Sequence, residues 1–128
     1  MKKRNEKGFT LVELIVVMAV LAIISAIAVP RFIGVQDKAK EDADYATGAM
    51  IAKAAELYFA KEEDAVSPVL ASELVTANYI NGIEFKSETF KDYTADQVQV
   101  TFEGTGNVTV VASDGTDTDY LYPRSSGS

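Results

Sequence analysis

The chain contains no cysteine, no histidine and no tryptophan, and only three of its 128 residues are proline. The lack of cysteine excludes the disulfides on which small exported domains often depend. The lack of histidine removes the usual general base and the commonest metal ligand. It also excludes a Ser–His or Cys–His nucleophile. We therefore expect a protein that is not an enzyme and has no cofactor.

Basic residues are also scarce, and they are unevenly placed. The chain has 12 basic and 19 acidic residues, a net charge of −7. Four of the basic residues lie within the first eight positions, beside one acidic residue. Removal of residues 1–8 would leave 8 basic and 18 acidic residues, a net charge of −10. Such an acidic product is poorly suited to neutralising phosphates, so direct binding to nucleic acid is not expected.

A long apolar segment follows the basic leader. Between Phe9 and Val29 the only charged residue is Glu13. As a helix this segment would rise about 31 Å, which matches the hydrocarbon core of a membrane. The preceding positive charges predict that the N-terminus stays in the cytoplasm and the rest lies outside. A carboxylate inside such a helix is costly, so Glu13 is expected to have a partner or a function.

Two ordinary interpretations of the segment remain open. It could be a cleaved secretory signal with a small-residue cleavage site at Ala26-Ile27-Ala28. In that case Glu13 interrupts the part of the signal that should be most apolar. It could instead be an uncleaved signal anchor, which would leave Glu13 without a partner in lipid. Either interpretation would make the protein a secreted or membrane-anchored binding domain.

The residues Gly8-Phe9-Thr10-Leu11-Val12-Glu13-Leu14 lie between the leader and an apolar run that ends at Pro30. This arrangement resembles the processing motif of type IV pilins and pseudopilins. The resemblance implies that a prepilin peptidase cuts after Gly8 and methylates the amino terminus of Phe9. It also implies that Glu13 meets the amino terminus of a neighbouring subunit. At low dielectric such a pair would set register, because a wrong register leaves both charges unpaired.

The resemblance also implies an α+β fold, in which one long N-terminal helix packs on an antiparallel sheet of three or four strands. We expect a removed leader over residues 1–8 and a transmembrane and assembly helix over residues 9–30. A pilin head would follow over residues 31–123. Residues 124–128 are interpreted as a polar tail or a cloning remnant.

Beyond Pro30 the helix is expected to continue in amphipathic form to about residue 63. Apolar residues recur there at spacings of three or four, which predicts one buried stripe against the sheet. The members of this predicted stripe are Phe32, Val35, Ala39, Ala43, Ala46, Met50, Ala54 and Leu57. Pro30 removes a backbone donor and, with Gly34, marks the weak point of the helix. Melting in an assembled fibre should therefore start near Pro30.

The head is expected to contain short elements. The predicted elements are a short helix or turn within Val69–Ile80, a first strand with Ile83 and Phe85, a hairpin of residues 98–102 and 108–112, and a last strand with Tyr120 and Tyr122. The hairpin is predicted from alternation of apolar residues on both sides of a glycine-containing turn. Such a small head would need the helix to complete its core.

An acidic turn lies near the C-terminal end of the head. Asp114, Asp117 and Asp119 lie within six residues of one another, and carboxylates are ligands that calcium prefers. Their spacing does not match the EF-hand loop, and a solvated acidic turn is the preferred interpretation. Calcium binding at these residues is therefore an alternative rather than the main expectation.

Taken together, these features predict the major subunit of a type IV pilus. The chain would reside in the cytoplasmic membrane before assembly and in an extracellular fibre afterwards. Its expected partners are further copies of itself, the prepilin peptidase and the pilus assembly machinery. The alternative is a pseudopilin of a type II secretion or DNA-uptake system, because both classes share the leader and the helix.

Overall fold

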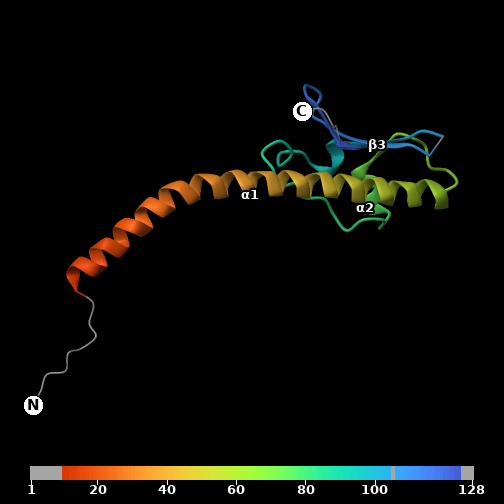
Figure 1. The fold of residues 1–128 in the computed structure, drawn as a ribbon. Coiled ribbons are helices and arrows are strands. Elements are labelled where there is room, and N and C mark those ends of the chain that lie inside the picture. Colours follow the sequence, from red (N-terminus) through yellow and green to blue (C-terminus); the bar gives the residue numbers. More distant parts are fainter. Residues whose placement is uncertain (1–9, 105, 125–128) are drawn as a thin grey trace, which may run out of the picture. The chain divides into compact units, whose positions relative to one another are not determined.

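The fold was analysed in a computed structural model, which describes residues 10–104 and 106–124. The chain divides into two compact units, Met1–Gln36 (unit 1) and Asp37–Ser128 (unit 2). Helix α1, Leu11–Lys61, belongs to both units (Figure 1). The long N-terminal helix predicted over residues 9–63 is therefore confirmed within two residues at each end.

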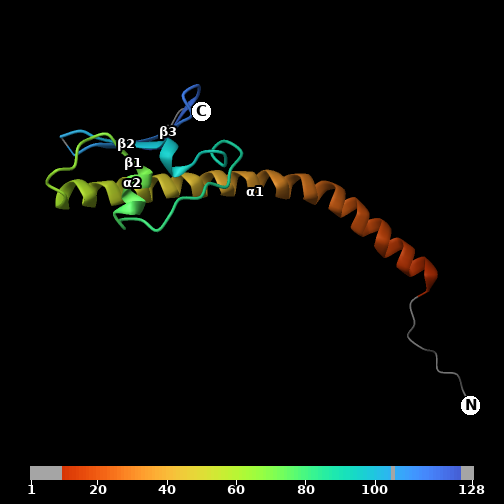
Figure 2. The ribbon, with the colours of Figure 1, turned by 180° about the vertical axis from the view of Figure 1, so that it is seen from behind.

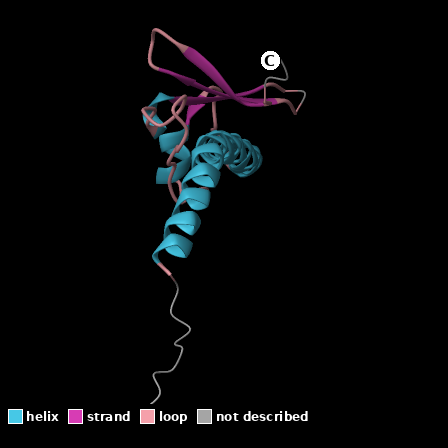
Figure 3. Ribbon diagram, turned by 60° about the vertical axis from the view of Figure 1, so that its left-hand side comes forward, coloured by secondary structure: helices cyan, strands magenta, loops and turns pink. Residues whose placement is uncertain are grey.

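Unit 2 consists of two layers, with an antiparallel sheet on one side of α1 (Figure 3). The sheet has four strands in the order β1-β2-β3-β4. Their bounds are Val69–Leu70 for β1, Val98–Phe102 for β2, Val108–Ser113 for β3 and Thr118–Tyr122 for β4. Helix α2, Ala71–Thr76, and the 3-10 helix η1, Ala95–Gln97, lie between β1 and β2 in the sequence (Figure 2). The predicted α+β fold is confirmed.

The hairpin of β2 and β3 agrees with the predicted alternation, because Val98, Val100, Val108, Val110 and Ala112 are all buried. The first strand predicted at Ile83 and Phe85 is wrong. That segment has no regular secondary structure, and β1 instead forms the edge of the sheet by pairing with β2. The side chain of Phe85 is buried by packing against Phe90 and not by strand pairing.

The face of α1 that packs on the sheet also differs from the prediction. Of the eight residues in the predicted stripe, only Ala54 is buried, and the other seven are exposed. The buried residues of α1 are Asp44, Gly48, Ile51, Ala52, Ala54 and Ala55. Gly48 determines which face of α1 packs on the sheet, because a Cβ at that position would lie 2.8 Å from both the Cβ and the carbonyl oxygen of Leu121. Only glycine lets the sheet approach the helix so closely.

A β-bulge brings Leu121 to this contact. Val110 pairs with Tyr122 whereas Val111 pairs with Tyr120, so the register shifts between these two pairs. The extra residue, Leu121, is fully buried, while Tyr120 is 53% exposed. Alternation alone had placed Tyr120 and Tyr122 in the last strand, which is confirmed. It could not show that a bulge turns the residue between them into the core.

The long segment between α2 and η1 is held against α1 by a buried carboxylate. Asp44 is 1% exposed, and it accepts hydrogen bonds from the backbone N–H groups of Lys86 and Ser87 at 2.8 and 2.7 Å. An aromatic cluster adds to this attachment. The ring centroid of Phe90 lies 5.6 to 6.3 Å from those of Tyr45, Phe85 and Tyr93. The segment is thus ordered by contacts to α1 instead of by its own secondary structure.

Replacing Asp44 with alanine should reduce the free energy of unfolding of the head by about 2 to 4 kcal/mol, because two backbone donors lose their shared acceptor. Asp44→Asn keeps one acceptor oxygen and should cost less. The exposed residue Asp42 provides a control, and Asp42→Ala should cost less than about 1 kcal/mol. Chemical denaturation of the detergent-solubilised chain, followed by tyrosine fluorescence, measures the free energy of unfolding of all three variants. Equal losses for Asp44→Ala and Asp42→Ala would contradict this account of Asp44.

Candidate functional site

The N-terminal end of α1 is closed by a reciprocal pair of hydrogen bonds. The backbone N–H of Glu13 donates to Thr10 Oγ1 at 3.2 Å, and the backbone N–H of Thr10 donates to Glu13 Oε2 at 3.4 Å. This arrangement is a capping box, which satisfies two donors at a helix start. This role of Thr10 was not predicted, although a threonine followed three residues later by a glutamate is the signature of such a cap.

The carboxylate of Glu13 therefore lies in the first turn of α1. The backbone dipoles of a helix favour negative charge at this end. The bond from the N–H of Thr10 to the carboxylate, at 3.4 Å, is long for an N–H···O bond, so it holds the carboxylate only weakly. Gly8 and Phe9, the two residues of the predicted processing site, lie outside the described residues.

Beyond this cap, the part of α1 in unit 1 is apolar on all sides. The large apolar side chains from Leu11 to Val29 are each between 48% and 72% exposed. By its length and composition, α1 is the one helix among the described residues that could cross a membrane. A helix that is apolar all round requires lipid or other helices as its surroundings. All of the described residues of unit 1 are exposed.

Pro30 lies inside α1, and the helix continues through Gly34. A Cβ built on Gly34 would meet nothing within 4 Å. The predicted melting near Pro30 concerns the packing of subunits in a fibre, so it stays a prediction.

The acidic turn between β3 and β4 is held by its own hydrogen bonds. Asp114 Oδ1 accepts from the backbone N–H groups of Asp117 and Thr116 at 2.9 and 2.8 Å, and these bonds lower the pKa of Asp114. Asp119 instead accepts a hydrogen bond from the hydroxyl of Tyr93 at 3.0 Å. Burial and this bond to Asp119 raise the pKa of Tyr93 to about 12.

The three predicted calcium ligands thus have different roles. Gly115 sits at the centre of this turn with a φ of +94°, which the tight reversal requires. Throughout the described parts of the chain, no three histidine, cysteine, aspartate or glutamate residues are grouped as they would be to hold a metal ion.

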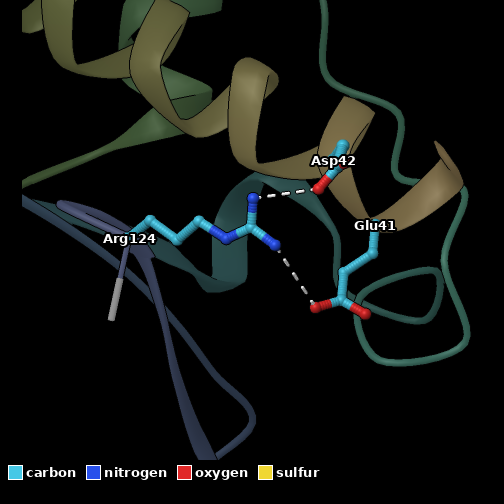
Figure 4. Close-up of polar contacts among 3 residues, drawn as sticks. All are labelled: Glu41, Asp42 and Arg124. Carbon is cyan, nitrogen blue, oxygen red and sulfur yellow. Dashed lines mark hydrogen bonds and ion pairs between the residues drawn. The ribbon is translucent and has the colours of Figure 1, made fainter. Parts of the chain in front are cut away.

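A second feature that the sequence did not indicate is an attachment of the last strand to α1. The guanidinium of Arg124 lies 2.9 Å from Asp42 Oδ1 and 3.9 Å from Glu41 Oε1 (Figure 4). It also lies 4.3 Å above the ring of Tyr45. Arg124 and Asp42 are 82 residues apart in the sequence, so no local pattern could have revealed the pair. Since all three charged groups are about half exposed, the ion pairs are worth little individually.

Comparison with known proteins bears on the N-terminal segment. A family profile described as the prokaryotic N-terminal methylation motif matches residues 3–29. The chain is 42% identical over 77 residues to prepilin peptidase-dependent protein A of Clostridium perfringens, a match that covers 59% of this chain and 54% of that protein.

Two further relatives come from Thermus thermophilus. The chain is 46% identical over 48 residues to PilA5, a type IV narrow pilus major component, which covers 38% of this chain and 41% of that protein. It is 42% identical over 38 residues to PilA4, a type IV wide pilus major component, which covers 30% of this chain and 29% of that protein. The chain thus spans about half the length, or less, of the curated relatives that it matches. No solved structure matches the chain significantly.

The methylation motif coincides with the basic leader and the apolar part of α1, and the α+β head follows it as the resemblance implied. The relatives are named for pilus structure or for dependence on the prepilin peptidase. Together, the motif, the fold and these relatives support the resemblance of the chain to the type IV pilin family.

Proposed function

We propose that the chain is the major structural subunit of a type IV pilus. In this proposal the prepilin peptidase cuts after Gly8 and methylates Phe9, and the mature chains polymerise through their N-terminal helices. The observation that supports it most is the match of residues 3–29 to the methylation motif, together with the exposure of large apolar side chains on all sides of α1 over the same residues. The subunit would act by packing and would catalyse no reaction.

We propose further that Glu13 sets the register between copies. Phe9 lies four residues before Glu13, about one helical turn, so the new amino terminus and the carboxylate form a self-complementary pair of charges. Between axially shifted copies the two charges would neutralise each other in apolar surroundings, where an unpaired charge is costly. The carboxylate lies in the first helical turn and is held there by one long hydrogen bond, so it would be free to accept such a partner.

A pilus subunit is favoured over a pseudopilin by the names of two relatives, which are both described as pilus major components. A pseudopilin of a type II secretion or DNA-uptake system remains the second candidate, because it would use the same leader and helix. The two differ in the length of the polymer. Long surface fibres that carry this chain, seen by immunogold electron microscopy, would distinguish a pilus from a short pseudopilus.

Processing can be tested on the native protein isolated from membranes. Mass spectrometry of the N-terminal peptide should find a chain that begins at Phe9 and carries one added methyl group. A chain that begins at Val29 would show that an ordinary signal peptidase had cut it, and the proposed processing would be wrong. An intact N-terminus would indicate an uncleaved anchor, and the proposed processing would again be wrong.

The role of the Glu13 charge can be separated from its role as a helix cap. Glu13→Gln removes the charge but keeps an oxygen that can accept the bond from the N–H of Thr10, whereas Glu13→Ala removes both. If the charge sets register, both variants should reach the membrane and reduce filament yield about tenfold or more, since an unpaired ammonium would be left in apolar surroundings.

Thr10→Ala is the matched control, because it removes one cap bond and keeps the charge. It should form filaments at close to the normal yield. Negative-stain electron microscopy of sheared filaments, with membrane fractions blotted for the chain, gives both readouts. Normal filaments from Glu13→Gln would show that capping alone explains the glutamate.

We also propose that the acidic turn of Asp114, Asp117 and Asp119 works without calcium. The hydrogen bonds to Asp114 and the bond between Tyr93 and Asp119 support this proposal, since they already occupy two of the carboxylates. The melting temperature of the chain should therefore be the same in calcium and in excess chelator. A rise of several degrees with calcium, abolished in Asp117→Asn, would establish a site here, because a bound cation stabilises the folded state by mass action.

A further inference from the structure

Helix α1 carries a second apolar face that its own sheet does not cover. This outer stripe consists of Phe32, Val35, Ala39, Ala43, Ala46, Met50 and Leu57, and all seven are exposed. The two largest members in unit 2, Met50 and Leu57, are 65% and 52% exposed. The members of the stripe are three, four or, between Met50 and Leu57, seven residues apart, which is the spacing of a helix face that packs against another surface. The predicted stripe was therefore a real apolar face, but it is not the one that contacts the sheet.

In unit 2 the outer stripe forms one wall of a groove. The other wall is the segment Tyr79–Ile83, which follows α2 in the sequence. The groove consists of two adjoining hollows of about 240 and 410 Å³, which share Met50, Tyr79 and Ile80 in their walls. Leu57 lines the larger hollow and Ile83 the smaller one. The groove is therefore open and apolar, and it could receive large side chains.

The charges around the groove differ from those of the rest of unit 2. Residues 37–128 include 17 acidic and 7 basic residues. Among the described residues that line the groove none is acidic, and the one charged residue, Lys53, pairs with Glu56 at 3.2 Å. Two carboxylates flank this lining, one bonded to a lining residue and one adjacent to a lining residue in the sequence, and these two form its acidic rim. Glu62 accepts a hydrogen bond from the Tyr79 hydroxyl at 3.1 Å, and the exposed Glu84 follows Ile83 directly.

An apolar floor with an acidic rim suits an apolar segment that carries a positive charge. The chain contains such a segment at Arg31–Val35, in which Phe32 and Val35 are 66% and 67% exposed. Arg31 is the first charge after the membrane-length run, so lipid tails do not cover the residues that follow it. Another acidic head would be repelled by the rim, whereas this segment contains no carboxylate.

We propose that the groove of Met50, Leu57, Tyr79, Ile80 and Ile83 receives the Arg31–Val35 segment of a second copy of the chain. Phe32 and Val35 fill the hollows, and Arg31 pairs with the acidic rim. The two patches are different surfaces of one chain, so the contact is head-to-tail, and a contact of this kind generates a filament when successive copies do not close into a ring. The inference rests on the proposed polymerisation and adds a second contact to the one at Glu13.

The absence of cysteine permits a direct test by disulfide cross-linking. The double variant Val35→Cys, Met50→Cys should give a ladder of dimers, trimers and longer species when purified filaments are mildly oxidised. Each single variant should give no ladder. The matched control is Val35→Cys, Thr116→Cys, because Thr116 is exposed in the turn between β3 and β4. This control should stay monomeric in the same filaments.

Three outcomes would overturn the contact. They are filaments of the double variant without cross-links, equal cross-linking in the Thr116 control, and dimers formed by Met50→Cys alone, which would mean that like surfaces meet. In the first two cases filaments exist, so the proposed function stands while the docking contact fails. If the wild-type chain forms no filaments at all, the proposed function fails and the contact fails with it.

A pair of substitutions at Met50 provides a second readout. Met50→Glu places a carboxylate in the apolar groove, where it would be buried by the second copy, and should lower filament yield about tenfold or more. Met50→Leu keeps the apolar surface and should polymerise normally. Because Met50 is exposed in the single chain, both variants should melt at the wild-type temperature. Normal filament yield from Met50→Glu would overturn the contact.

Discussion

The close approach of Gly48 to Leu121 determines how α1 is used. A side chain at position 48 would collide with the backbone of β4, so this contact selects the helix face that the sheet covers. Asp44, one turn earlier on that face, then reaches the backbone of Lys86 and Ser87. Ile51 and Ala55, on the following turns, become core. Because this face packs on the sheet, the outer stripe on another side of the same helix has no partner within the described chain.

One helix therefore faces three different surroundings. In unit 1 it is apolar all round and needs lipid or other helices. In unit 2 one of its faces completes the core of a small domain, while the outer stripe remains open. The strong negative charge of the head opposes its approach to a second head. In the proposed filament, close contacts between copies would therefore favour surfaces with few carboxylates, such as the apolar run and the groove beside Met50.

Local patterns in the sequence predicted the features that depend on neighbouring residues. The apolar run with its single carboxylate, the extent of α1 and the hairpin of β2 and β3 are of this kind. The buried face of α1 could not be predicted, because residues 32–57 contain two apolar periodicities and only the distant Leu121 decides between them. The burial of Phe85 could not be predicted from a local pattern either, since it depends on packing against Phe90 rather than on strand alternation. The bond of Asp44 to Lys86 and the pair of Arg124 with Asp42 join residues too distant in sequence for any pattern to indicate.

At the N-terminus the capping box and the proposed register contact are compatible. A single chain needs an acceptor for the free N–H groups at the start of α1, and Glu13 provides one at 3.4 Å. A bond of that length is weak, so little is lost when the carboxylate turns to a stronger, charged donor. The amino terminus of a neighbouring copy would be such a donor. The glutamate could thus stabilise the helix start before assembly and pair with a second chain afterwards, without a change in the fold of either.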